Sequence, residues 1–239
     1  MTGLLVSVRD RLEAELALAA GADLIDLKEP AAGSLGAVSL PVMHDVAVWL
    51  AGRRPLSVAL GELATLDPRL PGAVPAHASY AKLGLAACAG RPDWEDGWRG
   101  ACQRLPAGVA PVAVAYADWI QAAAPAPQQV LATAARANVR VLLLDTFHKQ
   151  SGNLFDLWPL DELRLFAAAV RRQELKLVLG GSLNLATIPT ALKLEPDYIA
   201  VRGAVCRPSR SGRLDPQLLS QVRAAVSSNA PNELARARR

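Results

Sequence analysis

The stretch PQQVLATAARANVRVLLLD, residues 127–145, contains the pattern that decides the fold. Its first part, residues 127–137, opens with proline and carries apolar residues at helical spacing, which predicts an amphipathic helix. Its last part, residues 141–144, is a short apolar run that is typical of a buried strand. Alternation of amphipathic helices with buried strands indicates a parallel sheet.

The same pattern recurs on both sides of this stretch. Eight apolar runs are predicted to be strands: 4–8, 24–27, 56–60, 80–83, 112–115, 141–144, 177–179 and 198–201. The segments predicted to be helices are 11–20, 41–51, 93–105, 127–137, 159–173, 184–194 and 216–226. Eight such units predict a single-domain (β/α)8 barrel of the TIM type over residues 1–227, rather than an open sheet.

Two segments depart from this pattern. Three prolines, Pro68, Pro71 and Pro75, interrupt the segment after the third strand and leave little room for a full helix there. Residues 228–239 are polar and follow no helical or strand pattern, so they are predicted to form a flexible C-terminal tail.

Composition and charge narrow the classes of function. The 239 residues are 51% hydrophobic and 20% charged, which is enough to bury one large core. The net charge is +4, but half of it comes from the last nine residues, so nucleic-acid binding has little support and anionic small molecules remain open. No secretory or membrane-spanning run is found, so we expect a cytoplasmic protein without a membrane partner.

Metal and thiol chemistry find little support in the sequence. The three cysteines are odd in number and widely spaced, which predicts neither a disulfide framework nor a metal-binding pair and fits a reducing compartment. His44 and His77 have no second histidine at ligand spacing, so surface positions are predicted and no metal site is expected. Cys206 has no evident partner base and is predicted to be structural.

Charged residues gather where the predicted strands end, which is where barrels of this type carry their catalytic groups. The five that we single out are Asp26, Lys28, Lys82, Asp145 and Lys149. Because side chains alternate along a strand, Asp26 and Lys28 are predicted to share one face. A single strand-end lysine is more often a solvated rim residue. Burying five ionic groups at one mouth without pairing or use would be costly, however, so the set favours a catalytic function.

Lys28 is the predicted amine catalyst of this set. A free lysine has a pKa of about 10.4, so at neutral pH very little of it is the nucleophilic amine. Lys82 and Lys149 would lower the pKa of Lys28, whereas Asp26 and Asp145, which would orient the amines and shuttle protons, would raise it. The sequence leaves this balance open.

The seventh and eighth strands run into glycine-containing turns, at the place where barrels commonly bind phosphate. The predicted phosphate-binding residues are Gly181, Ser182, Arg202 and Gly203. A plain turn would explain the glycines equally well. The turn at residues 33–36 and Arg213 are weaker candidates for the same role.

Eight segments carry a resemblance to a known family. They are LLVSVRD (4–10), GADLIDLKEPAAGSLGA (21–37), YAKLGL (80–85), VAYAD (114–118), LLLDTFHKQSGNLFD (142–156), LGGSL (179–183), VRGAVC (201–206) and SGRLD (211–215). In order, spacing and content they resemble the (5-formylfuran-3-yl)methyl phosphate synthases, also called 4-(hydroxymethyl)-2-furancarboxaldehyde-phosphate synthases. The proline-broken segment after the third strand departs from the family pattern.

This resemblance implies a reaction and roles for the charged residues. Two molecules of glyceraldehyde 3-phosphate would condense to a furan aldehyde phosphate, with release of one phosphate and two waters, early in methanofuran biosynthesis. No metal or organic cofactor would be needed. Lys28 would form the Schiff base and Lys82 would accept the proton, while Asp26, Asp145 and Lys149 match further site positions.

Two other functions remain open from the sequence. A simpler lysine-dependent aldolase or sugar-phosphate lyase would use Lys28 in the same way but release an open-chain product. A catalytically silent barrel would only bind a phosphorylated ligand or a protein partner. Triose phosphates are the expected small-molecule partners, and the sequence leaves homo-oligomer formation open.

Overall fold

The computed structural model describes residues 1–228, and in it eight parallel strands close into one barrel. The strands are β1 (Gly3–Val8), β2 (Leu24–Leu27), β3 (Leu56–Glu62), β4 (Tyr80–Gly84), β5 (Ala110–Tyr116), β6 (Val141–Asp145), β7 (Lys176–Leu179) and β8 (Tyr198–Val201). Each strand pairs with the next in sequence, and β8 pairs with β1 to close the ring. The predicted barrel of the TIM type is therefore confirmed.

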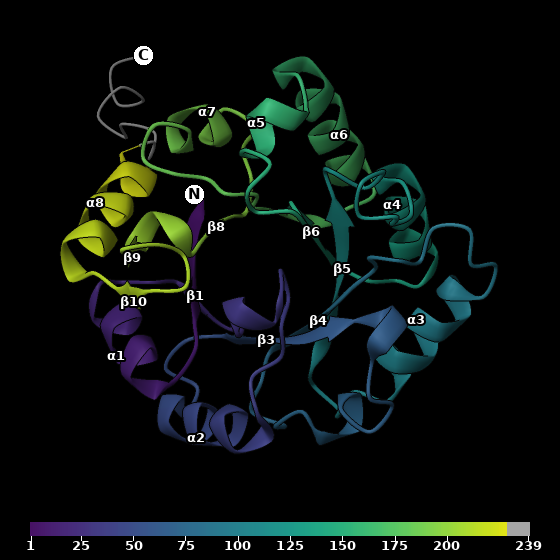
Figure 1. The fold of residues 1–239 in the computed structure, drawn as a ribbon, viewed down its shortest axis with the longest axis horizontal. Coiled ribbons are helices and arrows are strands. Elements are labelled where there is room, and N and C mark those ends of the chain that lie inside the picture. The colour runs from purple at the N-terminus through teal and green to yellow at the C-terminus, as the bar shows by residue number, and fades with distance from the viewer. Residues whose placement is uncertain (229–239) are drawn as a thin grey trace, which may run out of the picture.

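The helices lie around the outside of the strands (Figure 1). They are α1 (Arg11–Ala19), α2 (Leu40–Leu50), α3 (Trp94–Gln103), α4 (Pro127–Arg136), α5 (Leu154–Leu157), α6 (Leu160–Arg172), α7 (Ile188–Leu192) and α8 (Pro216–Ser227). The stretch at 127–145 forms α4 and β6 as predicted. Val130, Leu131 and Ala134 form the buried face of α4, and burial of such side chains stabilises the fold by roughly 1.5–3 kcal/mol for each large one.

Two connections differ from the regular unit. The proline-rich segment after β3 contains only the short 3-10 turns η2 (Leu63–Thr65) and η3 (Pro71–Ala73), which confirms that no full helix forms there. The helix predicted at 184–194 is wrong in length, because α7 covers only Ile188–Leu192. Asn184 explains the late start, since its Oδ1 accepts hydrogen bonds from the N–H groups of Ala186 and Thr187 and forms a turn instead.

Alternation along each strand separates an inner core from an outer one. On β2, Leu24 belongs to the cluster inside the barrel, whereas Ile25 and Leu27 belong to the larger cluster between strands and helices. The inner cluster includes Leu5, Leu24, Val112, Val114, Leu143 and Val178. These six side chains lie nearer the amino ends of the strands than the ionic side chains, which gather at the carboxyl ends.

A small hairpin that the sequence analysis does not predict follows β8. After the 3-10 turn η4 (Gly203–Val205), strands β9 (Cys206–Arg207) and β10 (Arg213–Leu214) pair antiparallel, and the chain then enters α8. Figure 1 shows this hairpin next to β1 and α8. Most of the predicted tail, residues 229–239, lies outside the described residues. No helix in residues 1–228 is long and apolar enough to cross a membrane.

Candidate active site

A cavity of about 710 Å³, the mouth cavity, opens at the carboxyl ends of the strands. Eight of the nine predicted site residues line it: Lys28, Lys82, Asp145, Lys149, Gly181, Ser182, Arg202 and Gly203. The ninth, Asp26, is fully buried beside them. The fold therefore brings together residues from β2, β4, β6, β7 and β8 that are far apart in the sequence.

Asp26 and Lys82 form a buried ion pair, with Lys82 Nζ 2.7 Å from Asp26 Oδ1. The hydroxyl of Ser7 donates a hydrogen bond of 2.8 Å to the other carboxylate oxygen. Burial alone would raise the pKa of Asp26, but the charges of Lys82 and Lys28 outweigh it and hold this pKa below its usual value. Asp26 is thus a charged anchor that fixes Lys82 at the floor of the mouth cavity.

Asp145 holds Lys149 in a second pair, with 2.6 Å between Lys149 Nζ and Asp145 Oδ1. The same oxygen accepts hydrogen bonds from the backbone N–H groups of Gly181 at 2.6 Å and Thr146 at 2.8 Å. Burial would raise the pKa of Asp145, but Lys149 and Lys28 and these hydrogen bonds lower it. Asp145 therefore stays ionised and joins the end of β6 to the turn after β7.

Lys28 differs from the other two lysines because it has no carboxylate oxygen within 4.0 Å in the described part of the chain. It is only 7% exposed. Burial is the largest cause that lowers the pKa of Lys28 to about 7. Lys149 and Lys82 add to this effect, whereas Asp145 and Asp26 oppose it. A substantial share of Lys28 is therefore the free amine near neutral pH, so the causes that lower its pKa outweigh the carboxylates that raise it.

The carboxylate of Asp118 holds the loop that carries Lys149. Asp118, at the end of the VAYAD segment, is 2% exposed and accepts hydrogen bonds from the backbone of Phe147 at 2.7 Å and His148 at 2.8 Å. The ring of His148 also lies 3.2 Å from Asp118. This carboxylate thereby fixes the loop between β6 and α5.

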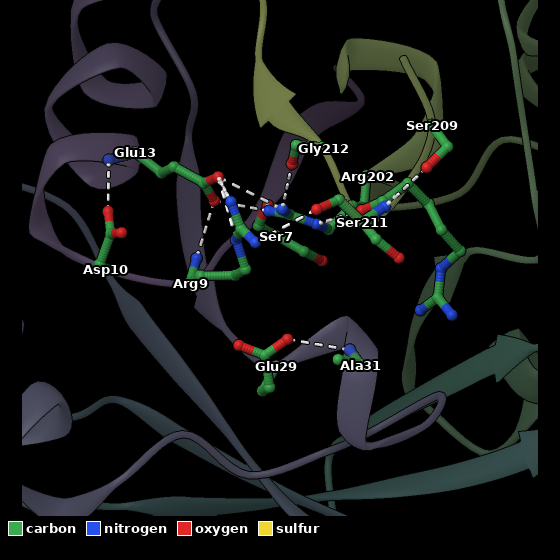
Figure 2. A network of polar contacts seen from close by, with 11 residues as sticks. Ser7, Arg9, Asp10, Glu13, Glu29, Ala31, Arg202, Ser209, Ser211 and Gly212 are labelled. Atoms are coloured by element: carbon green, nitrogen blue, oxygen red, sulfur yellow. Dashed lines mark hydrogen bonds and ion pairs between the residues drawn. The ribbon is translucent and has the colours of Figure 1, made fainter. Parts of the chain in front are cut away.

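Arg202 does not have the position that the sequence predicts for a phosphate ligand. Its two Nη atoms contact the Glu13 carboxylate, the shorter contact being 2.6 Å, and both residues are buried. Its other N–H groups donate to the carbonyl oxygens of Arg210 at 2.9 Å, Ser7 at 3.0 Å and Gly212 at 3.0 Å (Figure 2). All five N–H groups of the guanidinium are thus used inside the protein, and none remains for substrate.

The other predicted phosphate ligands lie on the wall of the mouth cavity. Gly181 has a φ of +87°, which favours glycine, and its N–H is already donated to Asp145. Ser182 and Gly203 are exposed and line the cavity, and their contact with phosphate stays a prediction. Arg213 is exposed on β10 and is not among the residues that line the cavity.

Sequence reasoning misses Glu62 and Tyr116, which meet inside the barrel. The hydroxyl of Tyr116 donates a hydrogen bond of 2.6 Å to Glu62, and burial raises the pKa of this carboxyl despite that bond. A bulge between Ala59 and Glu62 shifts the register of β3 and sets Glu62 opposite Gly84. Simple alternation would turn Glu62 outward, so only the bulge, at Gly61 with a φ of +86°, brings it in.

The remaining sequence predictions concern histidine, cysteine and metal. His44 and His77 are exposed, as predicted. Cys206 is 5% exposed and burial raises the pKa of its thiol, which agrees with a structural role. Residues 1–228 contain no group of three or more histidine, cysteine, aspartate or glutamate side chains that could hold a metal ion.

Comparison with known proteins identifies relatives along almost the whole chain. A model of the 4-HFC-P synthase family matches residues 4–223. The (5-formylfuran-3-yl)methyl phosphate synthase of Methanosarcina barkeri is 30% identical over 230 residues, covering 92% of this chain and 97% of the relative. The enzyme of the same name from Methanococcus maripaludis is 32% identical over 228 residues, with the same coverage.

Solved structures show the same barrel at lower identity. Phosphoribosyl anthranilate isomerase from Thermotoga maritima has a TM-score of 0.65 at 16% identity and matches 95% of this chain and 100% of its own. The 3-hexulose-6-phosphate synthase from Salmonella typhimurium has a TM-score of 0.63 at 11% identity and matches 96% and 100%. These two likenesses concern the fold alone. The family match and the relatives that share its name show that this chain is an enzyme of the (5-formylfuran-3-yl)methyl phosphate synthase family.

Proposed function

We propose that this enzyme condenses two molecules of glyceraldehyde 3-phosphate into 4-(hydroxymethyl)-2-furancarboxaldehyde phosphate through a Schiff base on Lys28. One observation carries the proposal. Lys28 is a buried lysine that lines the mouth cavity, has no carboxylate partner within 4.0 Å in residues 1–228, and has a pKa lowered to about 7. Such an amine is a ready nucleophile at neutral pH. The proposal assigns the product to methanofuran biosynthesis in the cytoplasm.

The first chemical step is attack of the neutral Lys28 amine on a triose carbonyl. Loss of water from the adduct gives an iminium, which acidifies the C–H bond beside it. A base then removes that proton and leaves an enamine. Lys82 lines the same cavity and is the proposed proton acceptor. As the ammonium paired with Asp26, it first gives a proton to the hydroxyl that leaves the Lys28 adduct as water, and the neutral amine that remains then takes the C–H proton.

The enamine carbon then attacks the aldehyde carbon of the second triose phosphate and forms the new carbon–carbon bond. One of the two trioses reacts as its ketone isomer. Phosphate leaves from the carbon beta to an iminium, and ring closure with dehydration forms the furan. The two trioses together lose one phosphate and two waters, which balances the atoms of the product. A cavity of about 710 Å³ is within the range that holds ligands of this size.

Borohydride trapping tests the proposal. The enzyme is incubated with glyceraldehyde 3-phosphate, with and without borohydride, and the mass of the adduct, the released phosphate and the ultraviolet absorbance of the furan aldehyde are measured. We expect one reduced adduct at Lys28 in the wild type and none in Lys28→Ala. Trapping that persists in Lys28→Ala would overturn the role of this residue.

The product separates the remaining alternatives. An aldolase or sugar-phosphate lyase would give the same trapped adduct but no furan absorbance and an open-chain product. A silent barrel would give no adduct at all. Release of phosphate without furan absorbance would show that the reaction stops before ring closure, and would contradict the proposed product.

A further inference from the structure

We infer that Arg210 is the side chain that binds a substrate phosphate at the mouth cavity, and that Glu13, Arg202 and Arg9 form a support that positions it. This inference rests on the proposed function, because it concerns how the same site selects a phosphorylated triose. Arg210 lies between β9 and β10 and lines the mouth cavity. Its Nη2 atom is buried and has no hydrogen-bond partner in the described residues.

The guanidinium of Arg210 also lacks a counter-ion. Two neighbouring arginines have carboxylate partners, at 2.6 Å for Arg202 and 2.7 Å for Arg207. Arg210 has none within 4.0 Å in residues 1–228, and unlike the exposed Arg213, which also has none, it lines the mouth cavity. The charge of Arg210 interacts with the charges of Asp145 and Lys149, two of the predicted catalytic residues. Burial lowers the pKa of Arg210, but arginine stays charged at neutral pH. A partly buried cation without a partner beside an open cavity is what an incoming anion requires.

Hydrogen bonds from two arginines hold the backbone carbonyls of three successive residues, 210–212. Arg202 donates to the carbonyl oxygens of Arg210 at 2.9 Å and Gly212 at 3.0 Å, and Arg9 donates to that of Ser211 at 3.1 Å. Figure 2 shows Arg202 and Arg9 close to Ser211 and Gly212. A Cβ on Gly212 would collide with the carbonyl of Arg207, so the loop closes tightly there.

Glu13 links the two supporting arginines. Its carboxylate lies 2.6 Å from Arg202 and 3.1 Å from Arg9, and the residue is 4% exposed on α1 (Figure 2). Hydrogen bonds between charged groups are stronger than those between neutral groups, so this support restricts the hairpin. We call Glu13, Arg9 and Arg202 the hairpin support. A rigid loop keeps the Arg210 side chain near the cavity before substrate arrives.

Phosphate fits this place by charge and by geometry. Guanidinium groups bind phosphate oxygens through two parallel N–H bonds, and a phosphate monoester carries about −1.5 to −2 charges at neutral pH. Ser209 and Ser211 flank Arg210 and line the same cavity, and Ser182 lines the cavity wall. Arg210 therefore replaces Arg202 as the cation of the phosphate site.

Calorimetric titration with inorganic phosphate tests this site without any catalysis. We expect Arg210→Ala to weaken phosphate binding at least tenfold, Arg210→Lys to weaken it less, and Arg213→Ala to leave it unchanged. Arg213 is the matched control, because it is an exposed arginine in the same hairpin. Equal binding by wild type and Arg210→Ala, or no binding by the wild type, would overturn the inference.

Trapping with two aldehydes then connects the site to substrate choice. Glyceraldehyde 3-phosphate and unphosphorylated glyceraldehyde are each trapped on Lys28 with borohydride over a range of concentrations. In Arg210→Ala the half-maximal concentration should rise at least tenfold for the phosphorylated aldehyde and stay the same for the other. A similar rise for both would contradict phosphate recognition. Loss of all trapping in the wild type would instead refute the Schiff base, while the phosphate titration would still decide on Arg210.

The hairpin support has its own variants. Glu13→Gln should weaken phosphate binding and leave glyceraldehyde trapping at Lys28 unchanged, a split that general damage to the fold would not give. If Glu13→Gln does not fold, Arg9→Met serves instead, since Arg9 is partly exposed and, within the hairpin, donates only to the carbonyl oxygen of Ser211. Unchanged phosphate binding in the folded variants would show that the support does not position Arg210.

Discussion

Two clusters of charged residues are built alike, from ion pairs and one unpaired cation, but they differ in chemistry. The lysine cluster (Asp26, Lys28, Lys82, Asp145 and Lys149) lies on β2, β4 and β6 and in the loops after β2 and β6. The arginine cluster (Arg9, Glu13, Arg202 and Arg210) lies on α1, in the loop before it, directly after β8 and in the hairpin. Both contain ion pairs, with contacts of 2.7 Å and 2.6 Å in the first and 2.6 Å in the second. Both also contain one cation without a carboxylate within 4.0 Å in residues 1–228.

The two unpaired cations respond differently to burial. A buried lysine without a partner lowers its pKa and becomes a neutral amine, whereas a buried arginine keeps its charge and requires an anion. Lys28 follows the first course, with its pKa lowered to about 7. Arg210 follows the second. Pairing with a carboxylate thus separates residues that hold the site together from those that are left to act on substrate.

The largest effect is expected from removal of the Lys28 amine. Lys28→Ala should lower turnover of glyceraldehyde 3-phosphate on the order of 10⁴-fold, because groups that act as a unit in covalent catalysis fail together. Lys28→Arg keeps the positive charge but cannot form a Schiff base, so it should be equally inactive. The initial rate of phosphate release measures this. Substantial activity in Lys28→Arg would show that charge, and not the amine, matters at this position.

Breaking the arginine cluster should mainly affect stability. Arg202→Met leaves the Glu13 carboxylate without its closest partner, and removing one member of a buried pair costs about 3–5 kcal/mol of the free energy of unfolding. The double variant Arg202→Met with Glu13→Leu should lose less than the single one, because no buried charge is stranded. Urea unfolding measures both. A double variant that is less stable than Arg202→Met would show that the cost does not come from a stranded Glu13 charge.

Replacing Lys28 should, in contrast, stabilise the fold. The pKa of Lys28 is about 7 in the folded protein and 10.5 in the unfolded chain, so stability from this group is present above 10.5 and lost as the pH falls toward 7. Lys28→Met lacks this loss and should be more stable at pH 7 by up to about 4 kcal/mol. Unfolding at pH 7 and pH 10 should show a smaller gain at the higher pH. An equal gain at both would exclude titration of Lys28 as its cause.

The sequence predicts the lysine cluster far better than the arginine cluster, and the reason is physical. Strand order and alternation are local patterns, so they place Lys28, Lys82 and Asp145 at one mouth. The contact between Arg202 and Glu13 spans 189 residues and depends on closure of the barrel between β8 and β1. Neither residue reveals the other through spacing, so the sequence does not show that protein partners already occupy the guanidinium of Arg202.

Irregular backbone limits the prediction further. The bulge in β3 turns Glu62 inward against the alternation of its strand, and the hairpin that carries Arg210 is too short to give a strand pattern. Such features follow from tertiary packing and leave almost no local signal. Gly84 is a local sign of the bulge in β3, since a Cβ at this position would collide with Glu62 and Tyr116.

The smallest expected effect concerns how the other residues of the lysine cluster shift the pKa of Lys28. The rate of iminium formation at Lys28 should rise with pH and reach half its maximum near pH 7, because only the neutral amine attacks. The charge of Lys149 helps to lower this pKa, and Asp145 opposes it. Lys149→Met removes the charge of Lys149 and leaves Asp145 without its ion-pair partner, so the midpoint should move upward, by roughly half a pH unit or more at the effective dielectric of buried sites.

Borohydride trapping with glyceraldehyde between pH 5 and 9 measures the midpoint without requiring turnover. Arg210→Ala is the matched control, because Arg210 is not among the largest causes that shift the pKa of Lys28. A midpoint that stays at 7 in Lys149→Met would mean that burial alone sets the pKa of Lys28, and that the pairing of its neighbours serves only to hold them in place.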